Sequence, residues 1–140
     1  MLSERGMIPV LIRLLIADDH EVVRDGLRMT LEGTGVQIVA EAIDGQQAFD
    51  KLLQHEVDVA LIDISMPRAD GFKFLEIIRQ AGSLVPVVMH SVHDGGEYLR
   101  RCQHLGAKGF VLKGQDQSVL LAAIRAAHTG DEYWSGPTSH

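Results

Sequence analysis

Residues with charged or reactive side chains stand directly after four short apolar runs of the sequence. They are Asp18 and Asp19 after the first run, Asp63 after the third, Ser91 after the fourth and Lys113 after the fifth. Three carboxylates held close together repel one another and raise each other's pKa unless a cation lies between them. A set of oxygen ligands of this size suits Mg²⁺ (or Mn²⁺) with several retained waters. The sequence therefore predicts a divalent-cation site if the fold brings these residues together.

The same residues could carry out phosphoryl transfer. A carboxylate beside a divalent cation and an ammonium group can attack phosphorus while the positive charges hold the phosphoryl oxygens. Asp63 is the candidate nucleophile, because it follows the middle run and stands apart from the acidic pair Asp18 and Asp19. Lys113 would then bind the phosphoryl group as a point charge, and the Ser91 hydroxyl would donate a hydrogen bond to it.

The elements that must position these residues are read from hydrophobic patterning, since short apolar runs alternate with segments of helical period. The runs are Val10–Ala17, Val36–Ala42, Val57–Ile62, Val85–His90 and Gly109–Leu112. Nearly continuous apolar runs are typical of parallel strands covered on both faces. Strict alternation predicts a doubly wound α/β fold, a five-stranded parallel sheet in the order 2-1-3-4-5 with five helices. Sites in such sheets lie beyond the carboxyl ends of the strands, where the polar residues above would meet.

Two of the helices are predicted to begin with a capping box. Asp44 with Gln47 three residues later marks one start, and Asp94 with Glu97 marks the other. Asp19 has a structural alternative of the same kind: it could cap the first helix instead of binding a cation.

Length and composition limit the classes of protein. The chain has 140 residues, the length of one domain, which we expect at residues 10–130 between tails at 1–9 and 131–140. Its formal net charge of −6 disfavours nucleic acid or an anionic membrane as a direct partner. Cys102 is the only cysteine, so an internal disulfide is impossible, and we expect a small buried hydrophobe there. No apolar stretch approaches the roughly 20 residues that span a bilayer, which predicts a cytoplasmic protein.

At these residues the chain resembles the receiver domain of two-component response regulators. The resemblance covers about residues 11–130 and rests on Leu15–His20 (LIADDH), Leu61–Pro67 (LIDISMP) followed by Asp70 and Gly71, Ser91, and Gly106–Lys113 (GAKGFVLK). It implies a flavodoxin-like (CheY-like) fold and a signalling protein that is not an enzyme beyond its own phosphorylation and slow dephosphorylation. By this resemblance Asp63 accepts a phosphoryl group from the histidine of a sensor kinase. Asp18, Asp19 and Asp63, with the backbone carbonyl of Ser65, would bind Mg²⁺.

The resemblance also implies a switch. Ser91 and Lys113 would contact the phosphoryl group, and the rotamer of Phe110 would respond to it. The surface of the fourth helix, fifth strand and fifth helix would then change and pair with a second copy of the chain or with an output domain. A dimer face on the first and fifth helices remains an alternative. The residues expected on the first of these surfaces are Tyr98, Arg101, His104, Lys108 and Gln117.

The motifs look most like the NarL/FixJ (LuxR-type) subfamily, whose receivers usually precede a DNA-binding domain. Contact with DNA would then require an output domain that this chain lacks, and Tyr133–Pro137 is similar to the start of the linker to such a domain. A stand-alone receiver that acts through protein contacts is the alternative.

Two other classes share part of the pattern. A Mg²⁺-dependent phosphohydrolase of the haloacid-dehalogenase type needs an acid two residues after its nucleophile, and Ser65 occupies that place. A flavodoxin-like cofactor binder needs a Ser-, Thr- and Gly-rich loop after the first strand, where this chain has two aspartates and a histidine. The remaining candidates, His20, His90 and His93, lack metal-site spacing and are predicted to be surface histidines.

Overall fold

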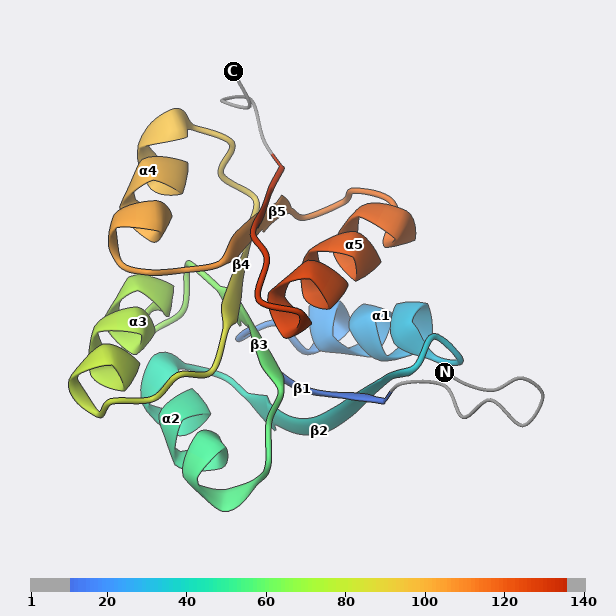
Figure 1. Ribbon diagram of the computed structural model, residues 1–140, viewed down its shortest axis with the longest axis horizontal. Coiled ribbons are helices and arrows are strands. Elements are labelled where there is room, and N and C mark those ends of the chain that lie inside the picture. Colours follow the sequence, from blue (N-terminus) through green and yellow to red (C-terminus); the bar gives the residue numbers. More distant parts are fainter. Residues whose placement is uncertain (1–10, 136–140) are drawn as a thin grey trace.

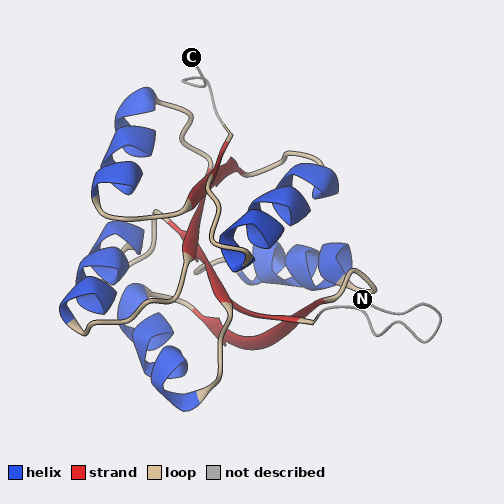
Figure 2. Ribbon diagram, viewed as in Figure 1, coloured by secondary structure: helices blue, strands red, loops and turns tan. Residues whose placement is uncertain are grey.

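The computed structural model describes residues 11–135 and shows one parallel sheet with helices on both faces (Figure 1, Figure 2). The strands are β1 (Ile12–Ala17), β2 (Val36–Ala42), β3 (Val59–Asp63), β4 (Val87–Ser91), β5 (Gly109–Leu112) and β6 (Tyr133–Trp134). The helices are α1 (Glu21–Leu31), α2 (Gly45–Gln54), α3 (Gly71–Gln80), α4 (Gly96–His104) and α5 (Gln117–His128). The strand order is β2-β1-β3-β4-β5-β6, and all neighbouring pairs are parallel.

The helices form one layer on each face of the sheet, with α1 and α5 on one side and α2, α3 and α4 on the other (Figure 1). Each layer packs on its own hydrophobic core, and every residue of β3 and β4 is buried between the two. Double coverage explains why these strands read as continuous apolar runs. β1 and β3 pair in parallel with Ala17 opposite Ile62, so the fold gathers the residues that follow them.

The doubly wound fold with five helices is confirmed, but the expectation of a five-stranded sheet is wrong. β6 extends the sheet beyond β5, within the segment expected to be a tail. The amide of Tyr133 donates to the Lys108 carbonyl at 3.0 Å, and the amide of Ser135 donates to the Phe110 carbonyl at 2.8 Å. An edge strand leaves backbone groups unpaired, and the chain returning from α5 pairs with them. A two-residue strand shows no alternation, so the sequence pattern could not reveal it.

The two predicted capping boxes have different outcomes. Asp44 caps α2 as expected, since its Oδ1 accepts from the amide of Gln47 at 2.8 Å. The Gln47 side chain in turn accepts from the amide of Ile43 at 2.8 Å. The second box is wrong, because α4 begins at Gly96 and Gly95 is its N-cap residue, so Asp94 lies one residue too early to cap it.

Cys102 is buried on the inner side of α4, as expected of a small hydrophobe. Burial raises the pKa of its thiol to about 12, so the group stays protonated and unreactive near neutral pH. Among residues 11–135 no helix is both long and apolar enough to cross a membrane.

Candidate functional site

Three charged side chains from different strands meet at the carboxyl edge of the sheet. Asp18 follows β1, Asp63 ends β3 and Lys113 follows β5. The Lys113 Nζ lies 2.7 Å from Asp18 Oδ2 and 3.2 Å from Asp63 Oδ2, so a single ammonium group bridges both carboxylates. Both carboxylate side chains are almost fully buried, with exposed fractions of 2% and 4%. The structure therefore brings together the predicted nucleophile, one acid of the predicted pair and the predicted lysine.

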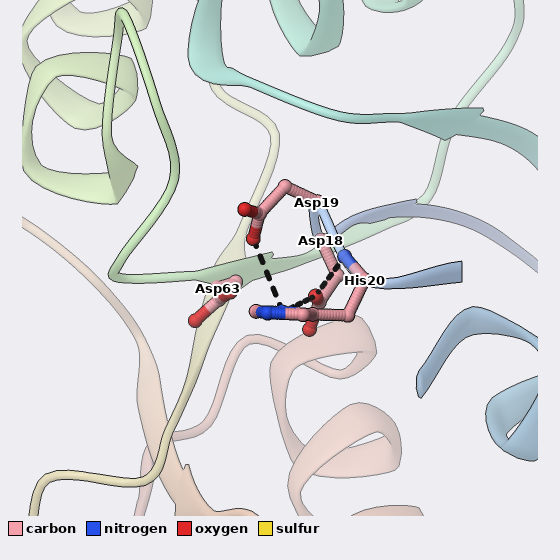
Figure 3. Close-up of side chains that lie close together, drawn as sticks. All are labelled: Asp18, Asp19, His20 and Asp63. Carbon is pink, nitrogen blue, oxygen red and sulfur yellow. Dashed lines mark hydrogen bonds and ion pairs between the residues drawn. The ribbon is translucent and has the colours of Figure 1, made fainter. Parts of the chain in front are cut away.

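Asp19 completes an acidic site that we define as Asp18, Asp19 and Asp63. Together with His20, these residues offer ligand atoms that all lie within 4.8 Å of one another (Figure 3). The His20 Nδ1 lies 3.2 Å from Asp19 Oδ1 and 3.3 Å from Asp18 Oδ1. Asp19 does not cap α1, because His20 is the N-cap residue and no side chain caps that helix. The structural reading of Asp19 as a cap is therefore wrong.

The charges of this site are not balanced. Burial, followed by the nearby charge of Asp18, raises the pKa of Asp63 to about 6, although Lys113 acts in the opposite direction. Burial alone would lower the pKa of Lys113, but its hydrogen bond to Asp18 and the charge of Asp63 outweigh this, so its pKa is raised. Lys113 therefore stays protonated. Asp18 and Asp63 compete for its single positive charge.

Of the two serines, only Ser65 has a hydrogen bond to Asp63 among the described residues. The backbone amide of Ser65 donates to Asp63 Oδ1 at 3.2 Å, and the Ser65 hydroxyl lies 3.3 Å from His93 Nε2. Ser91 ends β4 and is buried, and its Oγ accepts from the backbone amide of His93 at 2.9 Å. The Ser91 carbonyl accepts from the amide of Lys113 at 2.7 Å, which ties the ends of β4 and β5 together.

Other residues singled out from the sequence lie in less expected surroundings. The Phe110 side chain is fully buried in the core beneath α2, α3 and α4. His90 is also buried, with 8% exposure, so its prediction as a surface residue is wrong. Burial lowers the pKa of His90 to about 4 and keeps it neutral. The available signal was its place at the end of the apolar run Val85–His90, whereas the prediction rested on the absence of metal-site spacing.

A parallel α/β sheet whose carboxyl edge holds three acids, a bridging lysine and a hydroxyl defines the receiver class of signalling domain. Residues 14–125 match the family model described as "Response regulator receiver domain", and this chain belongs to that family. It is the receiver domain of a response regulator in a two-component system, and it is a signalling protein rather than a classical enzyme.

Individual relatives place the chain in the NarL/LuxR family. The oxygen regulatory protein NreC of Staphylococcus haemolyticus is 35% identical over 124 residues, which cover 87% of this chain and 57% of NreC. The chain thus spans little more than half of that relative. The receiver domain of the putative response regulator NarL from Mycobacterium tuberculosis has a TM-score of 0.82 and 31% identity, covering 87% of this chain and 99% of that one. A LuxR-family response regulator from Aurantimonas sp. SI85-9A1 has a TM-score of 0.83 and 29% identity, covering 88% of this chain and 89% of that one.

Proposed function

We propose that Asp63 accepts a phosphoryl group from the histidine of a sensor kinase in a reaction that requires Mg²⁺. The observation that carries this proposal is the bridging position of Lys113, whose Nζ contacts both Asp18 and Asp63. One ammonium cannot neutralise two buried carboxylates and the adjacent Asp19. A site left with excess negative charge favours a cation.

The donor set fits Mg²⁺. Mg²⁺ takes oxygen ligands and is usually bound in proteins by one or two carboxylates together with water and phosphate oxygens. Asp18, Asp19 and Asp63 would hold it, together with the backbone carbonyl of Ser65, whose amide already contacts the Asp63 carboxylate. The cation would lower the pKa of Asp63 and offset the negative charge that the phosphoryl group brings.

In the transfer step an oxygen of the Asp63 carboxylate attacks phosphorus. The bond to the kinase histidine breaks as the acyl phosphate forms, and the imidazole leaves with its electron pair. Lys113 and Ser91 hold the phosphoryl oxygens. Lys113 must release its ion pair with Asp63 to do so, while its contact with Asp18 keeps the ammonium in place.

The phosphorylated state is read through Ser91 and Phe110. Movement of the Ser91 hydroxyl toward a phosphoryl oxygen would shift the end of β4 and alter the packing of Phe110. The affected surface comprises α4, β5 and α5, and we propose that it forms a homodimer after phosphorylation. β6 pairs with Gly109 and Phe110 of β5, so strand pairing between two copies could not use that part of the edge, and we propose that the dimer forms through side chains.

The process that this receiver controls is proposed from its relatives. NreC is described as an oxygen regulatory protein, and a regulator of this family would control transcription through a DNA-binding domain linked to the receiver. We propose that the receiver unit runs over residues 10–130, with β6 added at its edge as the chain continues toward such a domain. Its single cysteine, which cannot form an internal disulfide, agrees with a place in the cytoplasm. A receiver that acts alone through protein contacts is the second candidate.

The test is incubation with a small-molecule phosphodonor, with and without MgCl₂, followed by intact mass spectrometry. We expect the protein to gain the mass of one phosphoryl group only when Mg²⁺ is present, and the label to be stable in acid and labile in base. Catalytic turnover of the donor without a labelled protein would instead indicate a phosphohydrolase. Absence of both labelling and turnover would refute phosphoacceptor function.

A further inference from the structure

Arg68 has a backbone φ of 64°, and among residues 11–135 it is the only residue other than glycine with a positive φ. L-amino acids avoid this conformation because of contacts of the Cβ atom, whereas glycine adopts it freely. Arg68 belongs to the β3–α3 loop, which we define as residues 64–70 and which begins directly after Asp63. Glycine would adopt this backbone without strain, so the contacts of the Arg68 side chain are what distinguish this position from a glycine.

The Arg68 guanidinium binds the buried cap of a different helix. Its Nε lies 2.8 Å and its second terminal nitrogen 2.7 Å from Asp44 Oδ2, while Asp44 Oδ1 accepts from the amide of Gln47. The hydrogen bond from the Gln47 amide lowers the pKa of Asp44 most, and Arg68 lowers it further. Together they hold this pKa below its usual range despite burial. One carboxylate therefore caps α2 and at the same time attaches the β3–α3 loop to it.

Backbone contacts continue this attachment along the loop. The amide of Gly45 donates to the Ala69 carbonyl at 2.6 Å, and a Cβ on Gly45 would lie 2.9 Å from that oxygen. At the end of the loop, the amide of Gly71 donates to the Ile64 carbonyl at 2.9 Å. A Cβ on Gly71 would lie 2.6 Å from the Asp63 carbonyl. The segment that carries Ser65 is thus held tightly between the first turn of α2 and the end of β3.

We propose that Arg68 is a positioning residue for the cation site. By binding Asp44 it fixes the β3–α3 loop so that the backbone carbonyl of Ser65 stays in place to meet the cation beside Asp63. The contact with Asp44 offsets the strained backbone of Arg68. This inference rests on the proposed function, since it assumes that Mg²⁺ binds at the acidic site.

The first experiment compares Mg²⁺ affinity with thermal stability in Arg68→Gly and Arg68→Ala. Both variants remove the contact with Asp44, but only glycine relieves the backbone strain, so Arg68→Ala should have the lower Tm. Mg²⁺ affinity, measured from amide chemical shifts during titration with MgCl₂, should fall in both by a similar factor of about ten or more. Asp44→Asn, which keeps an oxygen for the amide of Gln47, should show the same loss. Lys73→Gln, a matched loss of one exposed positive charge on α3, should bind Mg²⁺ as the wild type does.

The outcomes separate positioning from plain stability. If Mg²⁺ affinity follows Tm across the variants, or is unchanged in Arg68→Gly, the proposal is wrong. Hydrogen exchange of the metal-free protein provides a second readout, in which Arg68→Gly should speed exchange of the amides of Ser65, Gly45 and Gly71. Unchanged exchange would refute the attachment itself. If the wild type binds no Mg²⁺, the proposed function fails, and the exchange result alone shows whether Arg68 holds the loop.

Discussion

Two aspartates at opposite ends of β3 have opposite surroundings. Asp58 directly precedes the strand and is bound by Arg13. The backbone amide of Arg13 donates to Asp58 Oδ2 at 2.8 Å, and its Nε donates to the same oxygen at 3.0 Å. A guanidinium nitrogen of Arg13 also donates to Asp58 Oδ1 at 3.0 Å. Asp63 ends the same strand and shares its ammonium partner with Asp18. The Arg13 hydrogen bonds lower the pKa of Asp58, whereas burial and Asp18 raise the pKa of Asp63.

The difference separates a carboxylate whose charge is satisfied by one partner from a carboxylate that must share its partner. At the amino end of β3, the hydrogen bonds of Arg13 satisfy Asp58 within the protein. At the carboxyl end, the two buried acids Asp18 and Asp63 share one ammonium group, which leaves an excess of negative charge that the proposed cation would balance. The opposite pKa shifts of Asp58 and Asp63 thus mark the carboxyl end of β3 as the end where a functional site is proposed.

The largest expected contrast is in phosphorylation. Asp63→Asn should abolish labelling by a small-molecule phosphodonor, because the amide keeps the shape of the side chain and loses the nucleophile. Asp58→Asn, the same change at the other end of the strand, should label like the wild type. Intact mass spectrometry measures both. A fully labelled Asp63→Asn protein would show that another residue is the acceptor.

The next contrast is in cation binding. Asp19→Ala should weaken Mg²⁺ binding by about tenfold or more, because it removes one of the three charges of the acidic site. Glu56→Ala removes a carboxylate that contacts Arg13 at the opposite end of the sheet and should leave the affinity unchanged. Titration with MgCl₂ followed by NMR measures both affinities. Equal affinities in the two variants would contradict a cation site at the carboxyl edge.

A smaller contrast is in stability of the metal-free protein near pH 7.5. Asp63→Asn should raise the free energy of unfolding by about 1 kcal/mol after solvent screening, because it removes a charge that burial and Asp18 disfavour. Asp58→Asn should lower it by about 0.5–1 kcal/mol, because it weakens a partly exposed ion pair. Urea denaturation in EDTA measures both. If both variants changed the free energy of unfolding in the same direction, the distinction between the two ends of β3 would be contradicted.

The smallest contrast lies in how these effects vary with pH. The folded-state pKa of Asp63, about 6, exceeds the unfolded value near 4, so its favourable contribution is complete below pH 4 and is lost as the pH rises through 6. The stability gain of Asp63→Asn should therefore disappear as the pH falls from 7.5 to 4. Asp58 has a lowered pKa, so its contribution is present above pH 4 and is lost below it. Denaturation curves from pH 4 to 8 should show the first trend, and a gain that stays constant over this range would contradict it.

Much of the site could be predicted because its residues obey a topological rule. Asp18, Asp63, Ser91 and Lys113 each stand where an apolar run stops, and parallel strands bring such positions to one edge. The helix that starts at Asp44 was predictable because its cap and its capping partner are three residues apart. Local spacing and strand order were enough in these cases.

The features that escaped prediction depend on distant contacts or on exceptions to local rules. β6 forms because its backbone groups pair with the otherwise open edge of β5. A pattern of two residues is too short to predict such a strand. The contact between Arg68 and Asp44 spans 24 positions and requires a backbone conformation that arginine normally avoids. His90 is buried because both faces of β4 are covered, although the absence of metal-site spacing led to its prediction as a surface residue.

The buried thiol of Cys102 makes this chain a convenient host for site-specific labels. Because the only native cysteine is enclosed and stays protonated, a maleimide or nitroxide reagent would react with an introduced cysteine and leave Cys102 untouched. Val92, which follows Ser91 and is 68% exposed, offers such a position next to the end of β4. A spin label at Val92→Cys would report movement of the β4–α4 connection during phosphorylation without first removing a native cysteine.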